Sequence, residues 1–251
     1  SDLKHQHTKI DELIVNTEQH FDSDMSDIFF NQLEIPTPKY SLDAGGKSHA
    51  EMSAKIMIGL EEIIILENPD ALLVYGDTNS TMAAVLTASK LNLPIIHIEA
   101  GLRSKNLAMP EEVNRIIADR LGSYLFCPTK VAISNLIAEG YPNPIYGDNQ
   151  KQKIFHSGDV MFDLYKIMEK SFLFNKSKFK TTGKALAILT IHRQESTSSP
   201  KLVKKLFSEI NLLLNNGIHI VWPIHPRMRN ILEKDRKSTR LNSSHQIISY
   251  A

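Results

Sequence analysis

Two acidic residues follow apolar runs in the first half of the sequence. Asp77 comes soon after the run Ala71 to Tyr75, and Glu99 closes the run Pro94 to Glu99. A carboxylate at the end of an apolar strand is unfavourable unless it is paired or used, and open α/β sheets bind ligands at the carboxyl ends of their strands. These positions predict acid and base chemistry at a sheet edge. The simpler alternatives are that Asp77 and the hydroxyls after it merely cap a helix, and that Glu99 forms an ion pair with Arg103 or another cation.

A third carboxylate, Glu111, lies in the segment Met-Pro-Glu-Glu-Val-Asn-Arg, where Pro110 suits the first position of a helix. Because Arg115 follows one helical turn later, an ion pair on the helix surface is the simpler interpretation of Glu111. Together, Asp77, Glu99 and Glu111 would raise at least one carboxyl pKa by repulsion and desolvation, which supplies an acid and a base. We expect no cofactor and no metal, because the motifs lack the close His and carboxylate spacing of zinc or manganese sites.

Several neighbouring residues are expected to be structural. His97 lies within its strand and is expected to be a hydrogen-bonded interior histidine. The helix that starts at Pro110 is expected to bury an apolar stripe, Val113, Ile116, Ile117 and Leu121. Cys127 is the single cysteine and cannot form an internal disulfide, so the sequence favours a reducing cytoplasm as its setting. A nucleophilic role for this thiol is not expected.

Basic residues follow the last two strands that the sequence predicts. His192 and Arg193 come after the run 185–190, and His225 and Arg227 follow the run 218–223. Such groups supply the donors and positive charge that a diphosphate needs, so an acidic edge and a basic edge are expected to hold one ligand between two domains. The sequence has neither Gly-x-x-x-x-Gly-Lys-Ser/Thr nor Gly-x-Gly-x-x-Gly, which disfavours a P-loop phosphotransferase and a Rossmann dehydrogenase.

Short branched apolar runs alternate with stretches of helical period, which is typical of an α/β fold with a parallel sheet and crossover helices. We expect strands at 12–16, 71–75, 94–99, 123–127, 154–156, 185–190 and 218–223. We expect helices at 49–67, 80–91, 110–121, 131–139, 160–174 and 200–215. The last helix carries a stripe that predicts packing on a sheet, comprising Leu202, Leu206, Ile210, Leu213 and Leu214.

The polar stretch 175–184 predicts a domain boundary. We expect a first domain at 1–175, the start of a second at 176–234, and a tail at 235–251 that resembles translated vector sequence. The second domain is too short to complete a doubly wound sheet, so the chain is expected to be a piece of a longer protein.

The composition indicates a soluble globular protein. The 251 residues are 42% hydrophobic, and 29 Lys and Arg balance 28 Asp and Glu, so charge gives no argument for nucleic acid or an anionic membrane surface as partner. No apolar run approaches the roughly 18 to 20 residues that span a bilayer. A cytoplasmic location is expected.

These motifs, in this order, resemble the non-hydrolysing UDP-N-acetylglucosamine 2-epimerases, from about residue 12 to residue 233. The segments that carry the resemblance are Val-Tyr-Gly-Asp-Thr-Asn-Ser-Thr (74–81), His-Ile-Glu-Ala-Gly-Leu-Arg (97–103), Pro-Glu-Glu-Val-Asn-Arg (110–115) and Thr-Ile-His-Arg-Gln-Glu-Ser (190–196). The resemblance implies two Rossmann-like, doubly wound domains in a GT-B-like arrangement, a UDP-sugar substrate and a homodimer at full length.

The resemblance also implies residue roles. In this family UDP leaves by anti elimination, which gives a 2-acetamidoglucal, and adds back after C2 is reprotonated on the other face; the products feed cell-surface polysaccharide synthesis. Asp77, Glu99 and Glu111 match the acidic catalytic residues, with acid and base roles not divided among them, and His192 matches a histidine that helps the diphosphate leave. The expected substrate contacts are Gln19, His20, Arg103, Arg115, Arg193 and His225.

Two family segments are not found in this sequence, a Gly-Thr-Arg-Pro-Glu loop and a later Ser-Gly-Gly segment that binds uridine. We therefore expect the 251-residue chain itself to be inactive. Four alternatives stay open: a 2-epimerase of UDP-2,3-diacetamido-glucuronic acid, one of an N-acetylfucosamine precursor, a GT-B glycosyltransferase, and an inactive fragment that binds nucleotide sugars.

Overall fold

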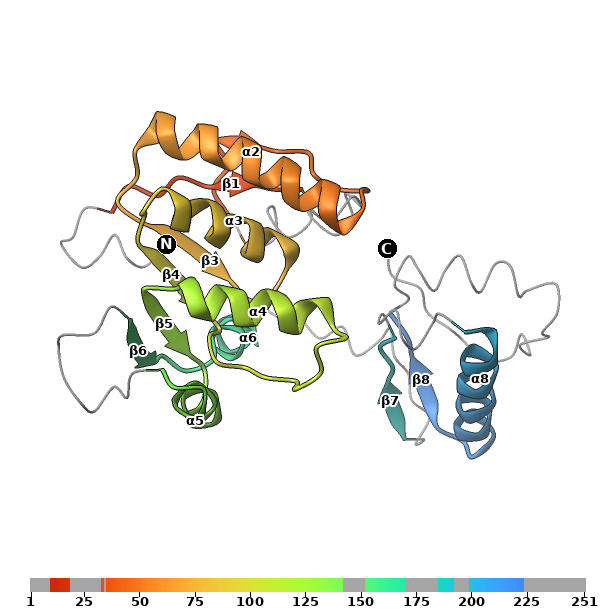
Figure 1. Ribbon diagram of the computed structural model, residues 1–251. Coiled ribbons are helices and arrows are strands. Elements are labelled where there is room, and N and C mark those ends of the chain that lie inside the picture. The colour runs from red at the N-terminus through yellow and green to blue at the C-terminus, as the bar shows by residue number, and fades with distance from the viewer. Residues whose placement is uncertain are drawn as a thin grey trace. The chain divides into compact units, whose positions relative to one another are not determined.

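The computed structural model describes residues 10–18, 33, 35–141, 152–169, 185–191 and 199–223 (Figure 1). The chain divides into two compact units, residues 1–171 and 172–251, and each is described here by itself. Every strand pair is parallel and the strands alternate with helices, which confirms the α/β class. The predicted boundary at 175 and the predicted tail at 235–251 lie outside the described residues.

The first unit contains a four-stranded parallel sheet in the order β3-β4-β5-β6. Its strands are β3 (Leu72–Tyr75), β4 (Ile95–Ile98), β5 (Tyr124–Cys127) and β6 (Lys153–His156). Each lies within a residue or two of a predicted strand. The last residues of β3 and β4, Tyr75 and Ile98, are register partners. The residues that follow these two strands, including Asp77 and Glu99, therefore leave the sheet next to each other.

Helices connect and cover the strands. They are α2 (His49–Glu67), α3 (Asn79–Lys90), α4 (Pro110–Leu121), α5 (Lys130–Ala138) and α6 (Val160–Glu169). Helices α2 and α4 begin and end as predicted, and α3 and α5 are shifted by one residue. The described part of α6 ends at 169, so the remainder of its predicted range lies outside the described residues. Helix α3 packs against both α2 and α4, and the three lie in a row in Figure 1.

Side-chain caps explain where several helices begin. The Ser48 side chain accepts from the backbone N–H of Glu51, and the Glu51 side chain accepts from the backbone N–H of Ser48. This capping box starts α2. Thr78 and Thr129 accept from backbone N–H groups in the first turns of α3 and α5. Pro110 occupies the first turn of α4, as predicted.

The core of the first unit lies between these helices and the sheet. One cluster joins α2, α3, α4 and the first two sheet strands, and comprises Leu60, Ile64, Val74, Ala84, Val85, Ala88, Ile95 and Ala118. A second cluster joins β5, β6 and α5, and includes Leu125, Cys127, Leu136 and Ile154. The first cluster packs against β3 and β4, whose ends carry the candidate site, and the second includes Ala100, directly after Glu99, so both hold those ends in place.

The buried face of α4 differs from the prediction. Val113, predicted to be buried, is exposed, and Ile116, Ile117 and Leu121 are only half-buried. The fully buried residues are Glu112, Asn114, Ala118 and Asp119. The stripe prediction was partly correct, because Ile117 and Leu121 pack against the core of the first unit, and wrong for Val113. Polar residues occupy the most buried positions because α4 also lies against the ends of the strands, where buried groups must find hydrogen-bond partners.

A short parallel pair, β1 (Val15–Asn16) and β2 (Tyr40–Ser41), completes the first unit. Strand β1 lies within its predicted range. Strand β2 was not predicted, because two residues carry no periodicity. Lys39 N–H donates to the Ile14 carbonyl at 2.9 Å and Leu42 N–H to the Asn16 carbonyl at 2.9 Å, which extends the pairing.

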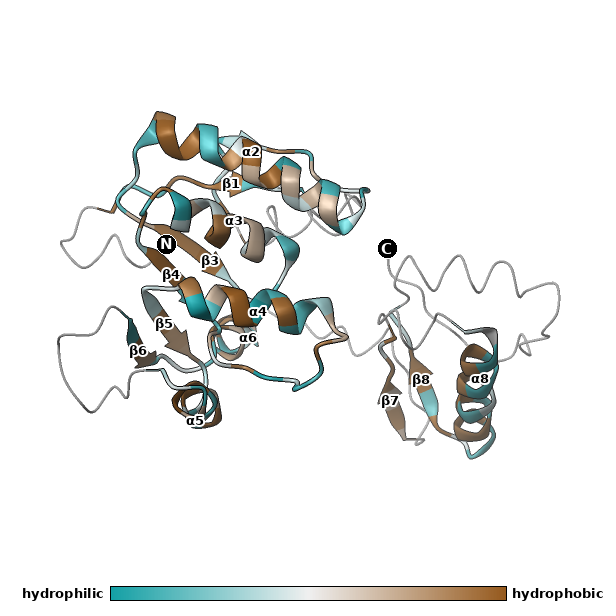
Figure 2. Cartoon of the chain, in the orientation of Figure 1, coloured by the Kyte–Doolittle hydropathy of each residue, from teal (hydrophilic) through white to brown (hydrophobic). Residues whose placement is uncertain are grey.

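The second unit is described through β7 (Leu186–Ile188), α8 (Pro200–Asn215) and β8 (His219–Val221). Figure 2 shows that α8 has a hydrophobic and a hydrophilic side. Val203, Phe207 and Ile210 pack with Ile191 and Trp222, which confirms that α8 covers its sheet. The stripe itself was only partly correct, because Ile210 is buried and Leu206 and Leu214 are partly buried, whereas Leu202 and Leu213 are exposed. Among the described residues, no helix is both long and apolar enough to cross a membrane.

Candidate functional site

The two carboxylates after β3 and β4 leave the sheet through tight backbone turns. Gly76 has φ +61° and its N–H donates to the Ile98 carbonyl at 3.0 Å. Glu99 itself has φ +70°, a conformation that is unfavourable for a side chain of this type by roughly 1 kcal/mol. Glu99 Oε2 lies 3.2 Å from where a Cβ on Gly76 would stand. The strained backbone therefore places the Glu99 carboxylate over the Gly76 turn, beside Asp77.

Burial and neighbouring charge both act on Glu99. Desolvation is the largest effect and raises the pKa of this carboxyl above its ordinary value, and the Asp77 and Asp159 charges raise it further. His97 and Arg115 act in the opposite direction without cancelling the rise. The predicted rise in one carboxyl pKa is confirmed for Glu99. Asp159 was not singled out from the sequence; it follows β6 and its side chain accepts from the N–H groups of α6.

Asp77 is paired with a cation and leaves capping to its neighbour. Arg115 on α4 forms an ion pair with Asp77 Oδ2, while Thr78 rather than Asp77 caps α3. The capping alternative is therefore confirmed for the hydroxyl of Thr78 and wrong for Asp77. Asn114, on the same helix, also fixes the backbone of Asp77. Its side-chain amide donates to the Asp77 carbonyl at 3.0 Å and to Asn79 Oδ1 at 3.2 Å.

Glu112 is the buried acid of α4. Its oxygens accept from the N–H of Ser104 at 2.9 Å and of Lys105 at 2.8 Å, and from Arg115 at 2.5 Å. Desolvation works to raise the pKa of Glu112, but these hydrogen bonds and the Arg115 charge outweigh it and hold the pKa below its ordinary value. Glu112 thus orients Arg115 toward Asp77. The sequence offered a sign of this buried acid in the adjacent pair Glu111 and Glu112, because only one of two neighbouring helix residues could face inward here.

Glu111 lies in the first turn of α4 and is exposed. Arg115 contacts Asp77 and Glu112 instead, so the ion pair considered for Glu111 does not form between these two described residues. The charges that act on Glu99 come from Asp77 and Asp159 among the acids, and not from Glu111. The structure therefore brings two of the three predicted carboxylates together, and a catalytic role for Glu111 stays a prediction.

Arg103 is held by acids other than Glu99. It donates to Asp119 Oδ2 at 2.6 Å and, through Nε and Nη2, to both oxygens of Glu139 at 2.7 and 2.8 Å. Its side chain is 3% exposed, so the ion pair considered between Glu99 and Arg103 is replaced by these contacts. A substrate contact for Arg103 stays a prediction.

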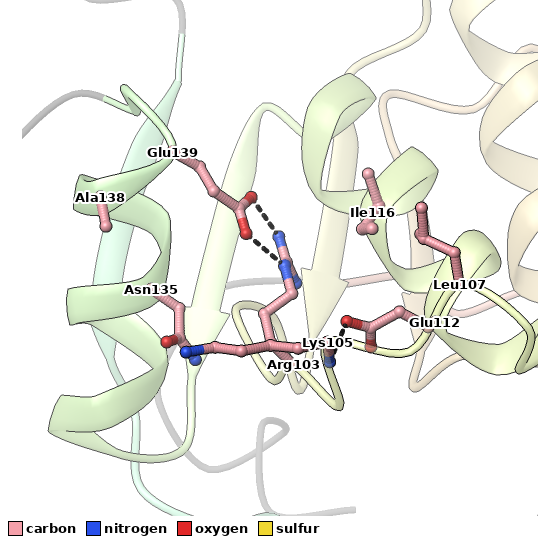
Figure 3. A pocket seen from close by; sticks show the side chains of 8 residues that line it. All are labelled: Arg103, Lys105, Leu107, Glu112, Ile116, Asn135, Ala138 and Glu139. Atoms are coloured by element: carbon pink, nitrogen blue, oxygen red, sulfur yellow. Dashed lines mark hydrogen bonds and ion pairs between the residues drawn. The ribbon is translucent and has the colours of Figure 1, made fainter.

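A hollow of about 310 Å³ lies beside Arg103, between α4 and α5 (Figure 3). Its walls are formed by Arg103, Lys105, Leu107, Glu112, Ile116, Asn135, Ala138 and Glu139. Figure 3 shows the two hydrogen bonds from Arg103 to Glu139 among these side chains. Asp77, Glu99 and Glu111 do not line it, so this hollow is separate from the carboxylate pair.

His97 is an interior histidine, as predicted. Its ring is fully buried, Nδ1 lies 2.8 Å from Asp119 Oδ1, and Nε2 lies 2.8 Å from the Gly76 carbonyl oxygen. Cys127 is also fully buried, and desolvation raises the pKa of its thiol to about 12, which argues against a nucleophilic role.

The predicted residues of the basic edge and of the segment after β1 cannot be placed. His192, Arg193 and His225, and also Gln19 and His20, lie outside the described residues. Within the described part of the chain, no group of three His, Cys, Asp or Glu side chains is close enough to hold a metal ion. What the described residues offer is a carboxyl with a raised pKa beside a carboxylate paired with an arginine, which suits proton transfer.

Comparison with known proteins gives a consistent family. Residues 3–250 match the family model described as UDP-N-acetylglucosamine 2-epimerase. The chain is 43% identical over 229 residues to a UDP-2,3-diacetamido-2,3-dideoxy-D-glucuronate 2-epimerase of Pseudomonas aeruginosa, which covers 90% of this chain and 61% of that protein. It is 36% identical over 249 residues to a UDP-N-acetylglucosamine 2-epimerase of Methanocaldococcus jannaschii, a match that covers 96% of this chain and 65% of that protein.

Solved structures agree with these relatives. The crystal structure of the M. jannaschii UDP-GlcNAc 2-epimerase in complex with UDP-GlcNAc and UDP matches with a TM-score of 0.82 at 35% identity, over 96% of this chain and 66% of that one. That of the Neisseria meningitidis UDP-GlcNAc 2-epimerase bound to UDP-GlcNAc matches with a TM-score of 0.80 at 26% identity, over 99% and 66%. The chain thus spans about two thirds or less of each of these proteins.

Proposed function

The chain belongs to the UDP-N-acetylglucosamine 2-epimerase family, and we propose that the whole protein interconverts UDP-N-acetylglucosamine and UDP-N-acetylmannosamine. The observation that carries the proposal is the pairing of Asp77 with Glu99 at the ends of β3 and β4. One carboxylate is held by Arg115, and the other carboxyl has a raised pKa. Epimerisation needs two such groups, because one must take a proton from C2 and the other must return a proton to the opposite face.

The proposed reaction has two halves. A carboxylate removes the C2 proton, the C2–H electron pair forms the C1–C2 double bond, and the C1–O bond breaks so that UDP leaves with its electrons. The second half returns a proton to the other face of C2 while UDP adds back to C1. The acid that returns the proton must be protonated near neutral pH, and the raised pKa of Glu99 supports such a role.

The other site residues are proposed to hold the nucleotide and sugar. His192 is proposed to assist the departing diphosphate, and Glu111 to share the acid and base work. Gln19, His20, Arg103, Arg115, Arg193 and His225 are proposed as substrate contacts. For Arg115 the support is its position, because it already orients Asp77. Oriented cations near a leaving diphosphate are the usual way to stabilise the charge that develops there.

The test is product analysis with the whole protein. Incubation with UDP-N-acetylglucosamine should give UDP-N-acetylmannosamine at equilibrium, with no requirement for an acceptor. Transfer of the sugar to an added acceptor, with no epimer formed, would establish a glycosyltransferase instead.

We propose as well that the 251-residue chain alone is inactive. The support is that the chain covers only 61% to 65% of the two relatives named above. We further propose a homodimer and a cytoplasmic location; the whole protein should elute as a dimer in size-exclusion chromatography with light scattering.

A second substrate has a specific observation in its favour. The 43% identical relative is a UDP-2,3-diacetamido-2,3-dideoxy-D-glucuronate 2-epimerase, and the M. jannaschii UDP-N-acetylglucosamine 2-epimerase is 36% identical. The two substrates differ at C3 and C6 but share the reacting C1 and C2, so the proposed carboxylate chemistry serves both. Comparing kcat/KM for the two UDP-sugars decides between them: a ratio above about 100 for the uronate, nearly 3 kcal/mol of discrimination, would assign it as substrate.

A further inference from the structure

His97 is a buried ring with an oxygen acceptor at each nitrogen. Nε2 lies 2.8 Å from the carbonyl oxygen of Gly76, and Nδ1 lies 2.8 Å from Oδ1 of Asp119. The ring and the Asp119 carboxylate are both fully buried. A carbonyl oxygen only accepts, so Nε2 must carry a proton to bond it. A neutral ring with that proton would turn the lone pair of Nδ1 toward a carboxylate oxygen.

The carboxylate of Asp119 accepts two further hydrogen bonds. Its Oδ2 accepts from Arg103 at 2.6 Å and from the backbone N–H of Gly101 at 3.1 Å. Charge-assisted hydrogen bonds of this kind favour the carboxylate form. A second proton on His97, at Nδ1, then gives every contact in the cluster a donor and an acceptor.

The acids around the cluster can pair with two cations. Arg103 is paired with Asp119 and, bidentately, with Glu139. Glu139 is 35% exposed, so it supplies Arg103 with a counter-charge at the edge of the cluster, and the fully buried Asp119 can also pair with an imidazolium at His97.

We propose that Asp119 holds His97 as an imidazolium, and that this buried ion pair positions the two catalytic carboxylates and sets the charge beneath Glu99. His97 fixes the Gly76 carbonyl one residue before Asp77, and Asp119 fixes the Gly101 N–H two residues after Glu99. Both are positioning residues, since neither reaches the surface of the site. The catalytic part of this proposal rests on the proposed function, and the protonation part does not.

The groups that face the His97 ring come from several elements. Asp119 on α4 bonds Nδ1, the Gly76 carbonyl after β3 bonds Nε2, and Glu99 follows on the ring's own strand. Arg103, in the loop before α4, reaches the ring only through Asp119. The His97 charge works to lower the pKa of Glu99, against desolvation and the acids around it. Losing the imidazolium should therefore raise the pKa of Glu99 further.

The substitution Asp119→Asn separates geometry from charge. The asparagine oxygen can accept from Gly101 and Arg103, and its amide can donate to Nδ1 of a neutral His97 ring, whose Nε2–H still reaches Gly76. The hydrogen bonds are kept, while the His97 cation and the Asp119 anion are lost together. Of the two, the His97 charge is the one that lowers the pKa of Glu99. In the whole protein, the limb of the pH–rate profile for C2 exchange that reports Glu99 should move to higher pH, with UDP affinity within about twofold of the parent. The matched control Glu139→Gln, which contacts Arg103 but not His97, should leave that limb in place.

The protonation state is tested independently of activity by ¹⁵N NMR of the ring. The parent chain at pH 7 should show both His97 nitrogens protonated, and Asp119→Asn should show one protonated and one bare nitrogen. A bare nitrogen in the parent would overturn the proposal even if the protein is an epimerase. If the NMR result holds but neither UDP-sugar is epimerised, the proposed function fails and the ion pair stands. If Asp119→Asn does not fold, the parent spectrum alone decides the protonation state. An unmoved pH limb in a folded variant would refute the catalytic part.

Discussion

Gly101 offers a sharp test of how tightly the segment after Glu99 is held. It has φ +80°, and a Cβ there would stand 2.5 Å from the carbonyl oxygen of Ala132 and 2.9 Å from its carbonyl carbon. These are backbone atoms of α5, so they cannot rotate away. Asp119 Oδ2 accepts from the Gly101 N–H at 3.1 Å, and Asn135 donates to the Gly101 carbonyl at 3.0 Å, so the glycine cannot move aside either.

Two costs add for Gly101→Ala. The left-handed conformation disfavours a Cβ by about 1 to 2 kcal/mol, and overpacking against fixed atoms typically adds about 1 to 3 kcal/mol. We therefore expect the free energy of unfolding of the 251-residue chain to fall by roughly 2 to 5 kcal/mol. Urea titration followed by far-UV circular dichroism measures this value directly.

Gly140→Ala is the matched control. Gly140 has φ +82°, nearly the same backbone conformation, and nothing lies within 4 Å of its Cβ position. It should lose only the conformational cost of about 1 to 2 kcal/mol, so the difference between the two variants isolates the contact with Ala132. Equal destabilisation by both alanines would refute the argument that α5 clamps the Gly101 segment.

Three further outcomes are expected. Glu99→Gln should gain stability relative to the parent as pH rises above 4.5. Burial and the Asp77 charge raise the folded-state pKa of Glu99 above its ordinary 4.5, so the parent loses stability as pH rises from 4.5 through the raised pKa. In urea titrations the two proteins should differ least below pH 4.5. Glu112→Gln should destabilise the first unit by about 1 to 3 kcal/mol in the same titration. The N–H groups of Ser104 and Lys105 bond different oxygens of Glu112, so the single amide oxygen can keep only one of these bonds, and the neutral amide cannot form the ion pair with Arg115. A loss under about 0.5 kcal/mol, the size of an ordinary surface substitution, would contradict its role. Cys127 should react with a thiol reagent only in denaturant, because it is fully buried and burial raises the pKa of its thiol to about 12. Rapid labelling of the native chain would contradict this placement of Cys127.

The sequence was most informative where periodicity and strand ends coincide. Helices α2 and α4 were predicted to the residue, and Asp77 and Glu99 lie beside each other because parallel strands deliver the residues that follow them to one edge. That inference needs only the strand assignments. The raised pKa of Glu99 followed from the same placement.

The errors share a physical cause, since hydrophobicity was used to orient α4. Its buried face is polar because it satisfies the ends of the strands, with Asn114 and Glu112 around Asp77 and with Asp119 on His97. Which of two adjacent glutamates faces inward depends on partners far away in sequence. No local pattern reports such partners, and Asp159 near Glu99 was missed for the same reason.

The measurement that tests the central claim most directly is deuterium uptake at C2 of UDP-N-acetylglucosamine recovered from D₂O with the whole protein. The parent should incorporate deuterium at C2 during epimerisation. Asp77→Asn and Glu99→Gln should each slow this uptake by about 100-fold or more, the usual contribution of a positioned acid or base, while circular dichroism confirms that both variants fold. Uptake at the parental rate in either variant would contradict the assignment of this carboxylate pair to the chemistry at C2.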